Sequence, residues 1–174
     1  MKNVVNYLLP ALAWLATVIV SSEQIRPQES TKSEAAFRQL ASLAGDWEGT
    51  QDGVALPIKE TYTLIAGGSA LMVQTKPRDE AVMLTMLSVD GNRLIATHYC
   101  SARNQPEMIS SEPGDLTKGL SFSLTRVTGM KTPDDWHNTG LMIKLDDKDH
   151  MTQWWTYLYK GKAGTSVFHY TRKK

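Results

Sequence analysis

The order of apolar and polar residues separates a short helical pattern from a long alternating one. Over residues 37–44, apolar side chains recur at intervals of three and four, the spacing of one helix face. Thr31 and Glu34 have the spacing of a capping box, and Gly45 is a typical stop after the last turn. The pattern predicts a helix over residues 32–44.

After Gly45 the pattern changes to the alternation of β-strands. Ten segments have strand length: 46–52, 58–66, 70–76, 81–89, 93–101, 107–111, 120–127, 137–145, 150–160 and 165–172. Turn-forming pairs such as Gly67-Gly68 and Asp90-Gly91 separate them, and the lack of further helical patterns argues against a parallel sheet. Because closure removes open sheet edges, we predict an all-β fold, an antiparallel up-and-down β-barrel of about ten strands with one short N-terminal helix as lid. A β-sandwich is the alternative.

The first 22 residues have the pattern of a secretory signal peptide. Lys2 precedes an uncharged apolar run over residues 7–20, and the small residues Ser21 and Ser22 follow it. We predict a signal peptide over 1–22, a polar leader over 23–30 and one barrel domain over 31–174. The protein is then secreted or periplasmic. An uncleaved anchor is the alternative, although the run is shorter than the roughly 20 residues of a membrane span.

The net charge limits the classes of binding partner, and the cysteine count limits the covalent cross-links. The 174 residues include 19 Lys and Arg against 18 Asp and Glu, and removal of residues 1–22 takes away one basic residue and no acidic one. A neutral chain has no basic footprint for nucleic acid, so we expect neither nucleic acid nor, after cleavage, a membrane as partner. The single Cys excludes an internal disulfide.

Two groups of motifs resemble known families. Gly45-Asp-Trp47-Glu-Gly49 is similar to the Gly-x-Trp start of the lipocalins, and to the longer Gly-x-Trp-x-Gly-x-Gly of nitrobindin-type haem-binding barrels, whose last Gly is Gln51 here. Residues 97–108 (Thr-His-Tyr-Cys-Ser-Ala-Arg-Asn-Gln-Pro-Glu-Met) and 153–157 resemble uncharacterised bacterial secreted proteins grouped as calycin-like domains of unknown function. The resemblance implies a calycin-like barrel and carries no agreed activity.

The resemblance also implies roles for three residues. In the lipocalin pattern an Arg from the last strand stacks on the first-strand Trp, and the matching residues here are Arg172 and Trp47. Nitrobindin-type barrels take their haem-binding His from near the C-terminus, which corresponds to His169. A His that only forms hydrogen bonds is the alternative at this position.

Candidate ligand-binding residues follow from the alternation. Gln153, Trp155 and Tyr157 share one face of their predicted strand and combine polar tips with apolar bodies, as cavity walls do. We predict that this face lines the barrel interior, with His98 on the opposite wall.

The remaining polar residues do not form a recognisable catalytic or metal site. His98 and Cys100 share a face, but zinc normally requires further ligands, so we expect a hydrogen-bonded His and a buried, inert Cys rather than a metal or reactive-thiol site. Acidic residues near His137 and His150 lack the spacing of a calcium loop. No nucleophile elbow or phosphate loop is present, so the sequence does not predict an enzyme.

Three hypotheses remain. The leading one is an exported barrel that binds a small, mostly apolar molecule without a cofactor or metal. The second is a haem protein that uses His169. The third is a barrel with a filled interior that acts as a structural or protein-interaction module.

Overall fold

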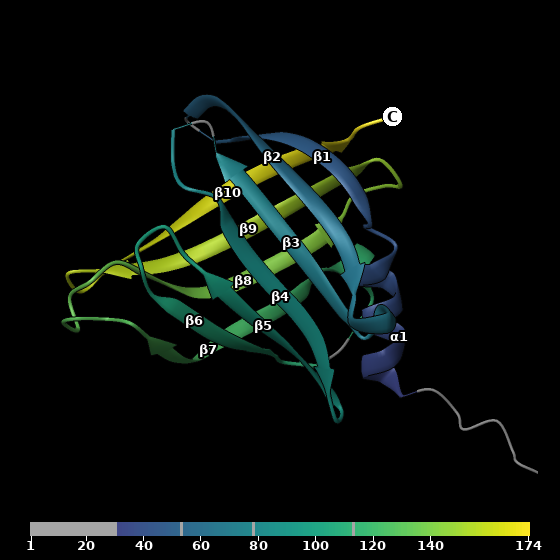
Figure 1. Ribbon diagram of the computed structural model, residues 1–174, viewed down its shortest axis with the longest axis horizontal. Coiled ribbons are helices and arrows are strands. Elements are labelled where there is room, and N and C mark those ends of the chain that lie inside the picture. The colour runs from purple at the N-terminus through teal and green to yellow at the C-terminus, as the bar shows by residue number, and fades with distance from the viewer. Residues whose placement is uncertain (1–30, 53, 78, 113) are drawn as a thin grey trace, which may run out of the picture.

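The computed structural model describes residues 31–174 except 53, 78 and 113, and it contains one α-helix and ten β-strands (Figure 1). The predicted signal peptide and leader lie outside the described residues. In chain order the elements are α1 (Lys32–Ala41), β1 (Gly45–Gln51), β2 (Val54–Ile65), η1 (Ala66–Gly68), β3 (Ala70–Pro77), β4 (Met83–Asp90), β5 (Arg93–Tyr99), β6 (Gln105–Ser110), η2 (Leu116–Lys118), β7 (Leu120–Thr128), β8 (His137–Leu145), β9 (His150–Tyr159) and β10 (Lys162–Arg172). Within this described part, no helix has the length and apolar character needed to cross a membrane.

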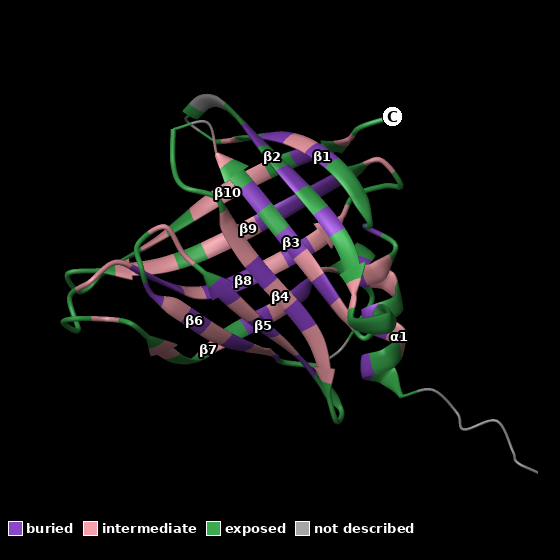
Figure 2. Ribbon diagram, viewed as in Figure 1, coloured by how far each residue is buried: buried purple, intermediate pink, exposed green. Residues whose placement is uncertain are grey.

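The ten strands form a closed barrel in which each strand pairs antiparallel with the next. Closure is made by β1 and β10, whose register places Trp47 opposite Arg172 and Gln51 opposite Phe168. Figure 2 shows buried residues alternating with exposed or half-buried ones along many of the strands, as expected when one face of each strand points inward. The predicted antiparallel up-and-down barrel with one short helix is confirmed, and the sandwich alternative is wrong.

Helix α1 begins where the capping box predicts. The backbone N–H of Glu34 donates to Thr31 Oγ1 at 3.2 Å, and the backbone N–H of Thr31 donates to Glu34 Oε2 at 2.8 Å. The helix ends at Ala41 rather than at residue 44, because the N–H groups of Leu43 and Ala44 bond to carbonyls only three residues back. The last turn therefore tightens before β1 begins.

The strands differ from the predicted ones mainly at the end of the barrel away from α1. Strand β5 stops at Tyr99 rather than at residue 101, because the chain turns there and Arg103 adopts a positive φ of 64°. Strand β10 starts at Lys162 rather than at residue 165, because Lys160 and Gly161, with φ of 48° and 71°, form a tight hairpin turn. The β9–β10 connection is therefore shorter than predicted, whereas the β5–β6 loop keeps its length and lies two residues earlier in the chain.

The barrel interior has two parts, which we call the filled half and the hollow half. The filled half lies next to α1 and consists of tightly packed apolar side chains, including Leu40, Leu43, Leu71, Leu87, Leu94, Met108, Leu120, Ile143 and Met151. The helix is attached to this end by two hydrogen bonds, from Ser33 Oγ to the Gly91 carbonyl and from the Leu116 N–H to Gln39 Oε1, each 2.8 Å. It thus closes the end opposite the hollow half.

Trp47 and Arg172 join the barrel seam to the end of the helix. The Arg172 guanidinium lies 4.2 Å from the centre of the buried Trp47 ring, and it donates to the carbonyls of Ser42 and Ala44 at 3.0 and 2.9 Å. Trp47 Nε1 donates to the Leu43 carbonyl at 2.8 Å. The carbonyls that follow a helix attract positive charge, so this contact combines stacking with helix capping.

Candidate functional site

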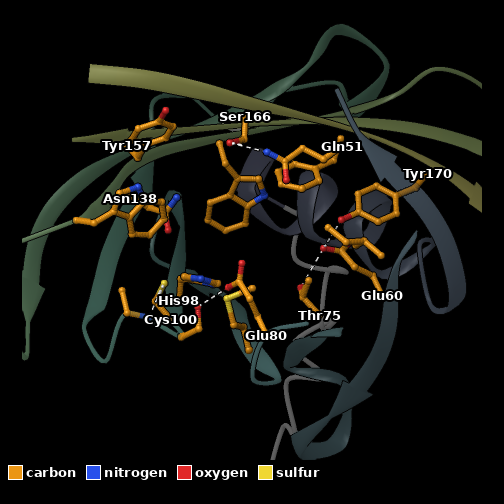
Figure 3. A pocket seen from close by; sticks show the side chains of 17 residues that line it. Gln51, Glu60, Thr75, Glu80, His98, Cys100, Asn138, Tyr157, Ser166 and Tyr170 are labelled. Carbon is orange, nitrogen blue, oxygen red and sulfur yellow. Dashed lines mark hydrogen bonds between the residues drawn. The ribbon is translucent and has the colours of Figure 1, made fainter. Parts of the chain in front are cut away.

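The hollow half contains a cavity of about 460 Å³. Its lining residues come from the strand ends and loops remote from α1, including Gln51, Glu80, Ser101 and Asn138 (Figure 3). Aromatic side chains supply much of the apolar wall, namely Trp136, Trp155, Tyr157, Phe168 and Tyr170. The volume lies in the range typical of small-molecule sites, which are apolar clefts with a few placed polar groups.

Two glycines make room for aromatic rings in this half. A Cβ at Gly49 would collide with the His169 carbonyl and with the Tyr170 ring, and a Cβ at Gly164 would collide with the Tyr157 ring. Both positions face the interior on strands β1 and β10. Because glycine has no side chain, the two tyrosine rings can lie across the neighbouring strand and form the cavity wall.

At its inner end the cavity reaches the buried carboxyl group of Glu60, on β2. Its Oε1 accepts hydrogen bonds from Thr75 Oγ1 at 3.0 Å and from Tyr170 Oη at 3.1 Å. Its Oε2 accepts from Tyr62 Oη at 2.8 Å and from Gln153 Nε2 at 2.7 Å. Both donors to Oε1 line the cavity, and neither donor to Oε2 does. The carboxyl group therefore stands at the boundary between the two halves.

The electrostatic environment of Glu60 is unusual for a carboxyl group. Burial raises its pKa, and the four hydrogen bonds oppose that rise. Burial also raises the pKa of Tyr62 and of Tyr170, and the neighbouring Glu60 adds to both effects. Among the residues that the structure describes, no Lys, Arg or His forms an ion pair with Glu60. All four partners are neutral donors.

Gln153 links Glu60 to the aromatic wall. Trp155 Nε1 donates to Gln153 Oε1 at 2.8 Å, which fixes the amide so that its NH₂ group faces Glu60 and Tyr62. A donor such as the indole N–H determines which side of the amide is oxygen. The orientation of Trp155 and the bond to the carboxyl group are therefore coupled through one side chain.

His98 lies on the wall formed by β5, and it is 5% exposed. Its Nδ1 is 2.9 Å from Thr85 Oγ1, and its ring lies 4.8 Å from the Trp155 ring at an angle of 50°. Burial lowers the pKa of His98 from 6.5 to about 4, so the imidazole is neutral near pH 7. Within the described part of the chain, its Nε2 has no hydrogen-bond partner.

The structure brings together the residues that the sequence selected for ligand binding. Trp155, Tyr157 and His98 line the cavity, and Gln153 lies just beyond its inner end, against Glu60. Cys100 also lines it and is half-buried rather than fully buried as expected. Partial burial raises the pKa of its thiol, which favours the protonated form. In the described ranges, no group of three or more His, Cys, Asp or Glu side chains is arranged to hold a metal ion.

His169 lies elsewhere. Its side chain is 53% exposed on the outer face of β10, with Nε2 3.2 Å from Asp52 Oδ1 and Nδ1 3.3 Å from Thr152 Oγ1. It does not line the cavity. A haem held by His169 would therefore have to lie outside the barrel.

Glu60 was not among the residues selected from the sequence. It lies in the polar run Lys59-Glu60-Thr61, which resembles a solvent-exposed stretch of strand. The signal available in the sequence is its position between Ile58 and Tyr62, because residues two apart share a face and both neighbours are large apolar or aromatic residues. The structure buries all three side chains. The hydrogen-bond donors on β3, β9 and β10 are distant from Glu60 in the sequence, so local patterns do not reveal them.

The comparisons with known proteins show similarity at the level of the fold. No protein-family model matches the chain, and no curated protein matches it. Among solved structures, the chain is similar to Rv2717c from M. tuberculosis, with a TM-score of 0.57 and 14% identity, over 80% of this chain and 98% of that one. It is also similar to a DUF3598-family protein of unknown function from Nostoc punctiforme, with a TM-score of 0.51 and 13% identity, over 78% of this chain and 49% of that one. This chain spans about half the length of the second protein.

Proposed function

We propose that this barrel binds a small molecule with an apolar body and one polar group, without chemical conversion. The observation that supports this is the cavity of about 460 Å³ that is lined by aromatic rings and ends at the buried Glu60 carboxyl group. Aromatic side chains supply large contact areas with little loss of rotamer freedom, and the carboxyl group and His98 supply orientation.

The hollow half favours this proposal over a purely structural barrel. The filled half reaches full burial with Leu, Ile, Met and Phe side chains, and the same strands continue into a region where the interior space is not filled. Glycine at positions 49 and 164 allows the tyrosine rings to line this space rather than occupy its centre. A barrel that only served as a scaffold would gain stability by filling it, because unfilled apolar space forfeits packing energy.

A blocked-cavity variant tests the proposal. Ser166 lines the cavity on β10, and its neighbour Thr165 is exposed. Ser166→Phe places a ring inside the cavity, whereas Thr165→Phe adds the same ring to the outer face and serves as the control. N-phenyl-1-naphthylamine, a neutral fluorescent probe, is titrated into each protein. We expect binding by the wild type and by Thr165→Phe and at least roughly tenfold weaker binding by Ser166→Phe. Equal binding by all three proteins would contradict the proposal.

Native mass spectrometry identifies the natural ligand. The protein is purified from its source cells without denaturation, and the mass of the intact protein is compared with that after unfolding. We expect a bound small molecule that is released on unfolding and is absent from Ser166→Phe expressed in the same cells.

We further propose that the protein acts outside the cytoplasm, on the strength of the predicted signal peptide. Expression of the full chain followed by fractionation tests this. We expect the exported fraction to contain a protein that begins after Ser22, and recovery of the intact chain in the cytoplasm alone would contradict it.

A further inference from the structure

We propose that the polar group of the ligand is a cation, an organic amine or quaternary ammonium, that binds on the cavity side of Glu60 among the aromatic rings. This inference rests on the proposed function, since it names the chemical class of a ligand for the same cavity. Three independent features of the lining support it: its charge, its aromatic faces and the neutral surroundings of Glu60.

The charged side chains that line the cavity have one sign. Glu60 stands at its inner end and Glu80 at its rim, and no Lys or Arg occurs among its described lining residues. The one basic side chain there, His98, is neutral near pH 7. A cleft lined by charges of one sign concentrates ligands of the opposite charge. A ligand with a carboxylate would meet two acidic side chains and, among the described lining residues, no cationic one.

The aromatic rings that line the cavity pack against one another and, in the described part of the chain, carry no cation of the protein. Trp136 stacks on Tyr157 and Phe168 on Tyr170, with ring centres 5.5 and 6.3 Å apart. Trp136, Trp155, Tyr157, Phe168 and Tyr170 all border the cavity, and Figure 3 shows Tyr157 and Tyr170 on opposite sides of it. The two cation–π contacts within the described residues involve Tyr159 and Trp47, neither of which is a lining residue. Rings without a protein cation are the arrangement that recognises ammonium ligands.

Glu60 lacks a counter-charge. Its hydrogen bonds from Thr75, Tyr170, Tyr62 and Gln153 satisfy the oxygen atoms but bring no positive charge into a buried site. A buried carboxylate is costly unless a cation accompanies it. Glu60, Thr75 and Tyr170 all line the cavity, so a ligand cation would approach the carboxyl group from the Oε1 side. A bound ammonium group would complete the pair.

Glu80 adds a second acidic side chain, at the rim of the cavity. Ser101 Oγ donates to Glu80 Oε2 at 2.8 Å, which ties the β3–β4 loop to the β5–β6 loop and holds the carboxylate at the cavity. Figure 3 places Glu80 and Glu60 at separate positions along the wall. A cation entering from solvent meets Glu80 first, and it finds a second carboxyl group at the inner end.

Three matched compounds test the charge of the ligand. 2-Phenylethylammonium, 2-phenylethanol and phenylacetate have similar bodies and carry a positive, a neutral and a negative polar group. Each is used to displace N-phenyl-1-naphthylamine from the full chain near neutral pH. We expect the ammonium compound to displace the probe at a concentration roughly tenfold lower than the alcohol, with phenylacetate the weakest.

Variants then assign the preference to Glu60. We expect Glu60→Gln, which keeps the shape and removes the charge, to abolish the advantage of the ammonium compound over the alcohol. Glu107→Gln removes a carboxylate of the same type that pairs with Arg126 at 3.0 Å on the barrel exterior, and we expect it to leave the advantage unchanged. If Glu60→Gln does not fold, Glu80→Gln at the exposed rim provides the second test, with an expected loss of about threefold in the advantage.

The outcomes separate the two proposals. Equal displacement by the ammonium compound and the alcohol, or tighter binding of phenylacetate, overturns the cation proposal while probe binding still supports the ligand site. A preference that persists in Glu60→Gln overturns the role of Glu60. If the probe does not bind the wild type, calorimetric titration with the three compounds decides, and absence of binding by all of them overturns both proposals.

Discussion

The filled and hollow halves of the barrel are built from the same strands and differ in their inward residues. On β4, Leu87 and Met83 point inward four residues apart. Leu87 is fully buried in the layer next to α1, whereas Met83 is partly exposed and lines the cavity. Alternation therefore determines which face points inward, and the identity of the inward residue determines whether the interior is packed or open.

The cause of the difference lies at the barrel ends. Helix α1 brings Phe37 and Leu40 against the filled half, so the strand residues at this end meet an apolar surface. At the other end the strands are joined by turns and loops, and Trp136, Tyr157 and the glycines at 49 and 164 form a wall around space. One half stabilises the fold, and the other is available for binding.

The largest expected difference between the halves concerns truncation on β4. We expect Leu87→Ala to lower the free energy of unfolding by about 3 kcal/mol, because it leaves a void in a close-packed layer. Met83→Ala removes a side chain that borders existing space, so we expect a loss below about 1 kcal/mol. Urea denaturation of the two variants measures both values. Similar losses would mean that the hollow half is packed as tightly as the filled half.

A pH experiment examines the wall of the hollow half. His98 has a pKa of about 4 in the folded state and 6.5 ordinarily. Between these values the unfolded chain binds a proton that the folded chain does not, so stability falls as pH decreases from 6.5 to 4. The difference corresponds to about 3 kcal/mol. We expect the wild type to lose about this much more stability over the interval than His98→Gln, measured by urea denaturation. His150→Gln, at the exposed start of β9, is the control.

Glu60 has the opposite effect on how stability depends on pH. Because burial raises its pKa above 4.5, the folded chain retains a proton that the unfolded chain has released, and stability falls as pH rises from 4.5 through the folded pKa. Glu60→Gln removes this contribution. If the stability of Glu60→Gln decreased with pH over that range more than that of the wild type, the assigned direction would be wrong.

The sequence predicted the strand number because alternation is a local signal. It also selected Gln153, Trp155 and Tyr157 for the interior by the same rule, and the structure places all three there. It did not reveal Glu60, because the four donors come from residues 2 to 110 positions away in the chain. Hydrogen-bond networks that form only when the barrel closes cannot be read from local periodicity.

The contact between Arg172 and Trp47, at the seam of the filled half, is expected to contribute less to stability. We expect Arg172→Ala to lower the free energy of unfolding by about 1–2 kcal/mol, because it removes the stacking on Trp47 and the hydrogen bonds to the Ser42 and Ala44 carbonyls. Arg172→Lys keeps the charge but not the paired donors, so it should recover only part of the loss. Thermal unfolding measures both variants. An unchanged midpoint for Arg172→Ala would show that the seam does not depend on this contact.

The smallest effect comes from enlarging side chains. Ser166→Leu places a larger side chain in the cavity. We expect it to change the free energy of unfolding by less than about 0.5 kcal/mol, because the added atoms occupy space that is already open. Ala96 is fully buried, so Ala96→Leu must displace its neighbours and should cost about 1–3 kcal/mol. Urea denaturation compares the pair. A cost for Ser166→Leu equal to that for Ala96→Leu would mean that the cavity closes in solution, because only a collapsed interior would resist one added side chain as strongly as a packed one.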